Sequence, residues 1–299
     1  MRFFLKYFTG FCLAIFASIA AGNTALNAQQ SSSSVTPLYS SATVPGAISS
    51  KPRENTVTYE HSTVRLIAGD YRNKTWTAGV EIILAPGWKT YWRVPGDSGV
   101  PAEFEWKNST NVKTAEVSWP APKRYQDITG KSIGYKKHVI FPVTVTPENN
   151  SRPARLDLQL YYAVCSDICV PAQASLKLDL PVDMPPGMDL PRINKFLALV
   201  PQKLESAITV VDSKVIIIKA KPVLTIKLSG KVAKKTDILV EGSDAAFFDA
   251  PKAISSTNGE HVFHLPIDGI DKPGQLAGKV LKLTVLSGDI RFEKNIRLK

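Results

Sequence analysis

From residue 57 onward, hydrophobic and polar residues alternate in short runs separated by Pro, Gly, Asn and Asp. Successive side chains of a β-strand point to opposite faces, so this period of two indicates strands with one buried face. The pattern predicts strands at 63–69, 75–85, 113–119, 138–145, 156–164 and 174–180. Short strands at this spacing, with turn residues between them, are typical of an all-β sandwich.

The strand pattern breaks after residue 182. Pro-Pro-Gly at 185–187 ends one unit, and a short helical pattern with apolar residues on one side follows at 191–200. Alternation then resumes, and it predicts strands at 207–220, 223–230, 236–243, 260–267 and 279–288. We therefore predict a first β-domain at 57–182, a linker with a short helix at 183–204, and a second, smaller β-domain at 205–299.

The N-terminus predicts export. Arg2 and Lys6 precede an apolar run that reaches about Ala21, and small residues that suit cleavage follow. We expect a signal peptide at 1–28 and a flexible leader, rich in Ser, Pro and Ala, at 29–56. After cleavage we expect no stable membrane insertion, and a compartment in which disulfides persist.

The net charge of +11 indicates a general affinity for anionic surfaces. The lysines are scattered through the predicted strands instead of gathering with aromatic residues, which argues against a nucleic-acid partner. Lysines that face water and protect strand edges need no ligand. All five tryptophans lie between 76 and 119, where aromatic side chains on strands are usually core.

Two cysteines, Cys165 and Cys169, lie four positions apart in YYAVCSDICVPA at 161–172. As a structural disulfide the pair is weak, because closing so short a loop contributes only roughly 2 kcal/mol in the chain-entropy relation. A Cu(I) site would suit two thiolates, but His138 is on another strand, and Zn²⁺ would need four ligands. The spacing alone leaves a structural disulfide and a redox pair equally open, and we predict no metal site.

Three segments together resemble the N-terminal periplasmic domain of the DsbD thiol:disulfide interchange family, in the branch that includes the copper-sensitivity suppressor ScsB. They are LAPGWKTYWRVPGDSGVPAEFEW at 84–106, DITGKSIGYKKHVIFPVTV at 127–145, and the cysteine segment. The resemblance covers roughly 60–180 and implies an immunoglobulin-like β-sandwich with a reversible disulfide. The C-terminal part is similar only in general character to the second β-domain of some ScsB-like proteins.

The resemblance also implies roles for single residues. Cys165 and Cys169 would be the redox pair, in which Cys169 forms the mixed disulfide with partners and Cys165 resolves it. Access would be controlled by Tyr162, by Pro171 and by a cap loop of Gln126, Asp127, Ile128, Thr129 and Gly130. Ile128 stands where the family usually has an aromatic cap residue.

Full members of the family also carry a multi-helix membrane domain and a thioredoxin-like domain, which this sequence does not show. We therefore expect a stand-alone carrier, of the protein-disulfide reductase type and without a cofactor, in the periplasm of a Gram-negative bacterium. Its partners would be a membrane thiol reductase domain and thioredoxin-like periplasmic proteins. The alternatives are a non-catalytic β-sandwich binding module with a structural disulfide, and a Cu(I)-handling protein in copper tolerance.

Overall fold

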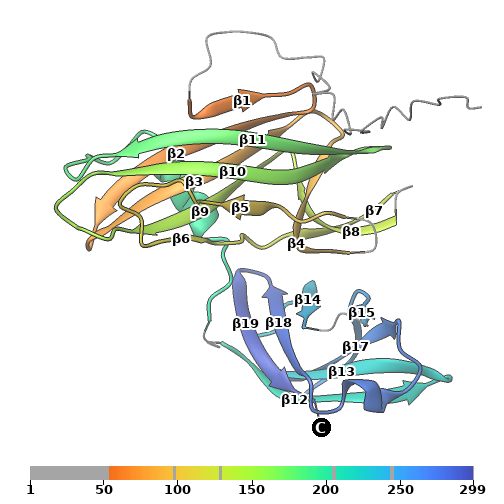
Figure 1. The fold of residues 1–299 in the computed structure, drawn as a ribbon. Coiled ribbons are helices and arrows are strands. Elements are labelled where there is room, and N and C mark those ends of the chain that lie inside the picture. Colours follow the sequence, from red (N-terminus) through yellow and green to blue (C-terminus); the bar gives the residue numbers. More distant parts are fainter. Residues whose placement is uncertain (1–53, 97–98, 128–129, 204–206, 243–245, 299) are drawn as a thin grey trace, which may run out of the picture. The chain divides into compact units, whose positions relative to one another are not determined.

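The computed structural model describes residues 54–96, 99–127, 130–203, 207–242 and 246–298 (Figure 1). The predicted signal peptide and nearly all of the predicted leader lie outside these residues. The all-β prediction is confirmed, since antiparallel strands dominate the described chain and a single α-helix accompanies them there. Within the same residues, no helix is long and apolar enough to cross a membrane.

The first half of the described chain forms two antiparallel sheets (Figure 1). One has the order β1 (Thr56–Thr58), β2 (Ser62–Arg72), β3 (Thr75–Leu84), β9 (His138–Thr146) and β6 (Thr114–Val117). The other has the order β11 (Cys169–Leu180), β10 (Ala154–Cys165), β4 (Lys89–Gly96), β8 (Gly130–Lys136) and β7 (Lys123–Asp127), and β5 (Glu103–Glu105) pairs with β10.

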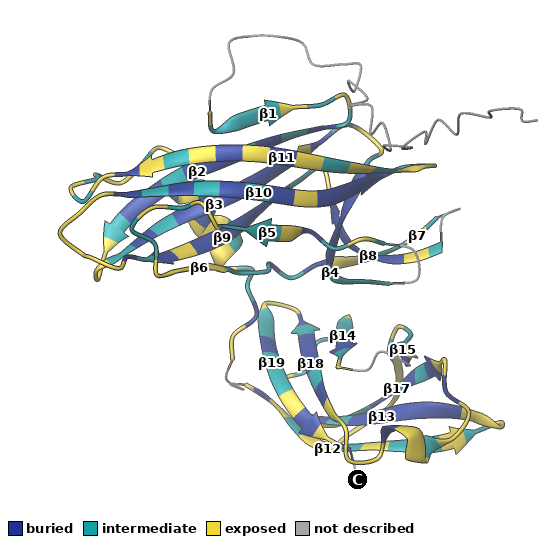
Figure 2. Ribbon diagram, viewed as in Figure 1, coloured by how far each residue is buried: buried dark blue, intermediate teal, exposed yellow. Residues whose placement is uncertain are grey.

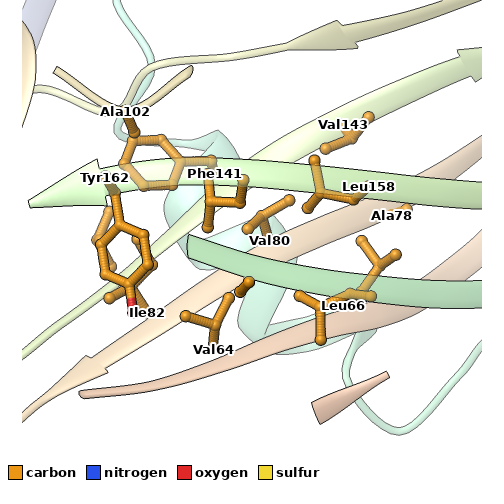
Figure 3. Close-up of a cluster of buried hydrophobic side chains, with 14 of the residues drawn as sticks. Val64, Leu66, Ala78, Val80, Ile82, Ala102, Phe141, Val143, Leu158 and Tyr162 are labelled. Carbon is orange, nitrogen blue, oxygen red and sulfur yellow. The ribbon is translucent and has the colours of Figure 1, made fainter. Parts of the chain in front are cut away.

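These two sheets enclose one hydrophobic core. Buried and more exposed positions alternate along most of β10, as the period of two predicts (Figure 2). Figure 3 shows Val80 and Ile82 of β3 together with Phe141 of β9 and Leu158 of β10. Each such side chain, fully buried, contributes about 1.5–3 kcal/mol to folding, so this core supplies a firm base for the strands that reach the site.

Helix α1 (Leu190–Leu197) covers the opposite face of the first sheet, where Ile193 packs with Ile67 and Ile140. Gly79 leaves the room for this contact, because a Cβ there would lie 2.8 Å from Ile140 Cγ2. The predicted helix at 191–200 is thus confirmed, although it begins one residue earlier and ends at Leu197. The linker between the predicted domains is packed onto the sheet.

Glu81 lies on this same face and is fully buried. Arg65 Nη1 donates to it at 3.0 Å, His138 Nε2 lies 2.7 Å from it, and Arg192 of α1 also donates to it. Buried carboxylates are tolerated where guanidinium groups and hydrogen-bonding side chains of this kind replace water. Glu81 therefore joins the helix to the sheet through charge as well as through apolar contact.

The second half of the described chain forms further antiparallel sheets with their own apolar core. One contains β12 (Ile208–Ile218), β13 (Lys221–Gly230), β17 (Glu260–Asp268), β15 (Phe247–Phe248) and β16 (Lys252–Thr257). The other contains β14 (Thr236–Glu241), β18 (Val280–Ser287) and β19 (Ile290–Arg297), and a short 3₁₀ turn spans Pro273–Leu276. We refer to residues 207–298 as the C-terminal sheets.

Several predicted strand ends in this half were wrong by one or two residues. The strand predicted at 207–220 ends at Ile218, because Lys219 and Ala220 take positive φ values of 49° and 62° and form a tight hairpin turn. The predicted domain bounds stay a prediction, since all described residues belong to one compact unit, 44–299. Leu239 of β14 is even buried in the core of the first two sheets.

Candidate functional site

Cys165 is the last residue of β10 and Cys169 is the first residue of β11. The two cysteines therefore face each other in register on either side of the hairpin turn, and they form a disulfide. The two sulfurs differ sharply in exposure. Cys165 is 0% exposed and is buried against Tyr91 and Ala163, whereas Cys169 is exposed. An attacking group that comes from solvent therefore meets Cys169.

Tyr91 of β4 lies directly beneath the exposed sulfur, with its hydroxyl 3.4 Å from Cys169 Sγ. Burial and the neighbouring carboxylate of Asp127 raise the pKa of Tyr91 above its ordinary value, so its hydroxyl keeps its proton at neutral pH. A neutral hydroxyl is a hydrogen-bond donor to a thiolate. Gly99 covers the ring closely, because a Cβ there would lie 2.5 Å from Tyr91 Cδ1.

An ion pair between a buried lysine and a partly exposed aspartate lies next to this tyrosine. Lys89 of β4 is 1% exposed, and its Nζ lies 2.7 Å from Asp127 Oδ2 at the end of β7. The same Nζ lies 6.0 Å from the centre of the Tyr91 ring, and the backbone of Lys89 pairs with Cys165. Because a buried ammonium needs a close counter-charge, this contact holds the β7–β8 hairpin on β4, beside the disulfide.

The structure places part of the predicted cap at this hairpin. Asp127 pairs with Gly130, whose φ of 107° suits glycine, and Gln126 pairs with Lys131. Ile128 and Thr129, between them, lie outside the described residues. Of these cap residues, the structure thus places Asp127 on Lys89, whose backbone pairs with Cys165.

The other two predicted access residues lie on the strands that carry the disulfide. Tyr162 is 2% exposed, and its hydroxyl lies 2.8 Å from Ser62 Oγ. Burial raises the pKa of Tyr162 to about 12, so it is neutral. Pro171 is exposed opposite Ala163. Tyr162 supports β10 from within the core (Figure 3), and Pro171 lies on the accessible side of the hairpin.

Sequence reasoning missed Tyr91 and Lys89 as site residues. Both belong to the segment GWKTYW at 87–92, so the resemblance already marked their neighbourhood without giving them roles. Among the described residues, no group of three or more His, Cys, Asp or Glu side chains is placed to hold a metal ion. The chemistry that this site offers is exchange at one exposed sulfur, with a buried sulfur as the leaving group.

We expect Tyr91→Phe to make the reduced Cys169 thiol harder to ionise. Loss of one hydrogen bond to the thiolate costs about 1 kcal/mol, which moves the pH midpoint of its alkylation up by about 0.7 unit. The measurement is the pH dependence of iodoacetamide alkylation of the reduced protein. Tyr162→Phe, which loses a hydroxyl bonded to Ser62, is the control and should leave the midpoint unchanged. Identical midpoints for both variants would contradict the role of Tyr91.

Residues 56–181 match the family described as "Thiol:disulfide interchange protein DsbD, N-terminal". The crystal structure of the N-terminal periplasmic domain of ScsB from Proteus mirabilis is similar at a TM-score of 0.66 and 24% identity, and the match covers 82% of this chain and 97% of that one. This likeness concerns the fold, and it extends beyond residues 56–181 into the C-terminal sheets.

A marsupial T cell receptor, at 8% identity over 81% of this chain and 98% of its own, has a TM-score of 0.18, which is too low to bear on the fold. No curated protein matches the chain. The segment matched by the family includes the disulfide, Tyr91 and the Lys89–Asp127 pair. Over residues 56–181, the chain therefore matches the DsbD N-terminal domain family.

Proposed function

We propose that this protein is a periplasmic carrier that relays reducing equivalents through the Cys165–Cys169 disulfide. The observation that carries the proposal is the difference between the sulfurs: Cys169 is exposed next to a hydroxyl donor, and Cys165 is 0% exposed. A structural disulfide has no need of such a difference, whereas a relay needs one sulfur to be attacked and one to leave.

The exchange proceeds in balanced steps. A thiolate of the electron donor attacks Cys169 Sγ, a bond forms between these sulfurs, the Cys165–Cys169 bond breaks, and Cys165 leaves as a thiolate that takes up a proton. A second thiol of the donor then displaces Cys169, which leaves as a thiolate hydrogen-bonded by Tyr91. The donor ends as a disulfide, and this pair has gained two electrons and one proton, with a second proton taken up from solvent when the Cys169 thiolate is protonated.

The same chemistry runs in reverse toward a client. The Cys169 thiolate attacks the client disulfide, and Cys165 then attacks Cys169 Sγ to release the reduced client. The match to the DsbD N-terminal family supports thiol-redox partners, namely a membrane thiol reductase domain as donor and thioredoxin-like proteins as clients. Ile168, 66% exposed beside Cys169, supplies an apolar contact for such a partner.

The periplasmic location rests on two observations. The N-terminal sequence has the layout of a secretory signal, and the similar ScsB domain is described as periplasmic. Disulfides persist in that compartment unless a reductase acts on them.

The test is the redox state of the pair in cells. Thiol trapping of the exported protein should find Cys165 and Cys169 partly reduced in cells that contain a membrane thiol reductase, and oxidised in cells that lack it. In vitro, a reduced thioredoxin-like domain should reduce the purified disulfide. If Cys165 and Cys169 stay oxidised in both strains, and the reduced thioredoxin-like domain does not reduce them, the relay proposal is wrong. A variant with both cysteines replaced by serine that keeps its partner and phenotype would favour a binding module instead.

A further inference from the structure

The strands that carry the site also carry three cations that meet carboxylates of the C-terminal sheets. The first is Arg93, two residues after Tyr91 on β4. Its guanidinium makes two hydrogen bonds to Glu241 of β14, at 2.6 and 2.9 Å, and one to Glu293 of β19, at 2.5 Å. These side chains are at most one-fifth exposed, so salt screens the contact less than it would screen a surface pair.

The other two cations lie on the β7–β8 hairpin, on either side of Asp127. Arg124 Nε lies 3.0 Å from both carboxylate oxygens of Asp237, and its Nη2 donates to the carbonyl of Ile238 at 3.1 Å. Lys131 Nζ lies 2.8 Å from Asp249. Burial opposes ionisation, but the hydrogen bond from Lys131 lowers the pKa of Asp249 below its ordinary value.

Apolar packing does not fill the space around these contacts. A cavity of about 470 Å³ is lined by hairpin residues such as Tyr125 and by Phe247 and Phe248 of β15. Where a cavity separates two elements, the polar contacts that bridge it carry more of the attachment. The ion pairs of Arg124 and Lys131 therefore hold this side of the hairpin.

We propose that Asp237 and Asp249 are positioning residues for the disulfide: they hold the β7–β8 hairpin so that Asp127 stays on Lys89, beside Tyr91 and Cys169. The C-terminal sheets then act on the site from outside the segment that the family match covers. The proposal deepens the proposed function and rests on it only in taking the Cys165–Cys169 pair as reactive.

The charges around Cys169 determine whether release of the β7–β8 hairpin favours or disfavours the Cys169 thiolate. Asp167 lies on its own loop, Tyr91 and Lys89 on β4, and Asp127 on the hairpin. When the hairpin is released, the negative charge of Asp127 moves away from Lys89, Tyr91 and the sulfur of Cys169. This change favours the Cys169 thiolate.

The test uses the full chain, reduced chemically, and a double variant, Asp237→Asn with Asp249→Asn. We expect iodoacetamide to alkylate Cys169 about four- to tenfold faster in this variant, since each of the two partly exposed ion pairs contributes a factor of about two to three. The pH midpoint of alkylation should fall. Glu260→Gln, which removes the exposed Lys227–Glu260 pair of the C-terminal sheets, is the control and should change neither.

Added salt gives a second measurement on the wild-type protein and the double variant. Alkylation of the wild-type protein should quicken as ionic strength rises, and that of the double variant should respond less, because its ion pairs are already gone. If the double variant melts earlier but keeps the wild-type rate, midpoint and salt response, the carboxylates only join the sheets and the proposal is wrong. A disulfide that never cycles in cells would overturn the relay and leave this result standing, because the measurement uses a small reagent and no partner.

Discussion

Replacing Cys165 with serine is expected to turn the site into a covalent trap. In Cys165→Ser the exposed Cys169 attacks a partner disulfide, but no second thiol remains to resolve the product. A single-cysteine thioredoxin-like domain activated with thionitrobenzoate should therefore become linked to Cys169, with stoichiometric release of the coloured thiol. Relay turnover should fall to background.

The matched variant is Cys169→Ser, which keeps the buried sulfur and removes the exposed one. Because Cys165 is 0% exposed, it reacts only after the hairpin end opens. An opening cost of roughly 3 kcal/mol would make its trapping about 100-fold slower than that of Cys165→Ser. The measurement is the rate of thiol release under matched protein concentrations.

Two outcomes would contradict this assignment. Equal trapping by both single variants would mean that the sulfurs are equally accessible in solution, and preferential trapping by Cys169→Ser would reverse their roles. Reduced wild-type protein is the positive control: it should attack as fast as Cys165→Ser but release the partner again. That release separates attack at Cys169 from resolution by Cys165.

The core strands β2 and β10 were predictable because buried positions alternate with more exposed ones along much of each strand. The ranges 63–69 and 156–164 fall on these two strands, and 75–85 falls on β3, whose outer face is covered by α1. The predicted strand ends were less accurate, as at Ile218. There the chain turns at Lys219 and Ala220, which are not typical turn residues, so only the backbone geometry reveals the hairpin.

The alternation of apolar and polar residues did not predict the strands that build the site, and the reason is physical. Residues 89–92 of β4 are all buried, so the segment has no exposed face and its sequence does not alternate between apolar and polar residues. The predicted strands also omit β8, whose positions 132–135 are all buried and include Gly134. A Cβ at Gly134 would lie 2.0 Å from the carbonyl oxygen of Thr90, so glycine is needed for β8 to approach β4.

The partners of the site charges could not be predicted from spacing either. Lys89 and Asp127 are 38 positions apart, and Arg93 and Glu293 are 200 apart. A lone lysine in an aromatic segment is ordinarily exposed, and only the sheet order β4–β8–β7 shows why this one is buried and paired. The disulfide itself was different: its two cysteines are close in sequence, and the resemblance was enough to pair them.

The largest loss of stability is expected from Glu81→Gln. Glutamine keeps the size of the side chain but removes the negative charge that faces Arg65, His138 and Arg192. Breaking a buried ionic cluster by removing one member costs about 3–5 kcal/mol, and we expect the lower end because the three partners are each about one-third exposed and regain water. Urea unfolding should show a fall of about 3 kcal/mol in the free energy of unfolding.

Glu116→Gln on β6 is the matched control, because Glu116 is exposed and its loss should change stability by less than about 0.5 kcal/mol. Proteolysis of the Glu81→Gln variant shows which part of the structure is destabilised. Because Arg192 belongs to α1, Glu81→Gln should also speed proteolysis within Leu190–Leu197, while Ile193 still anchors the helix on Ile67 and Ile140. A loss below about 1 kcal/mol, with α1 equally protected, would mean that apolar packing alone holds the linker to the sheet and that the buried charge contributes little.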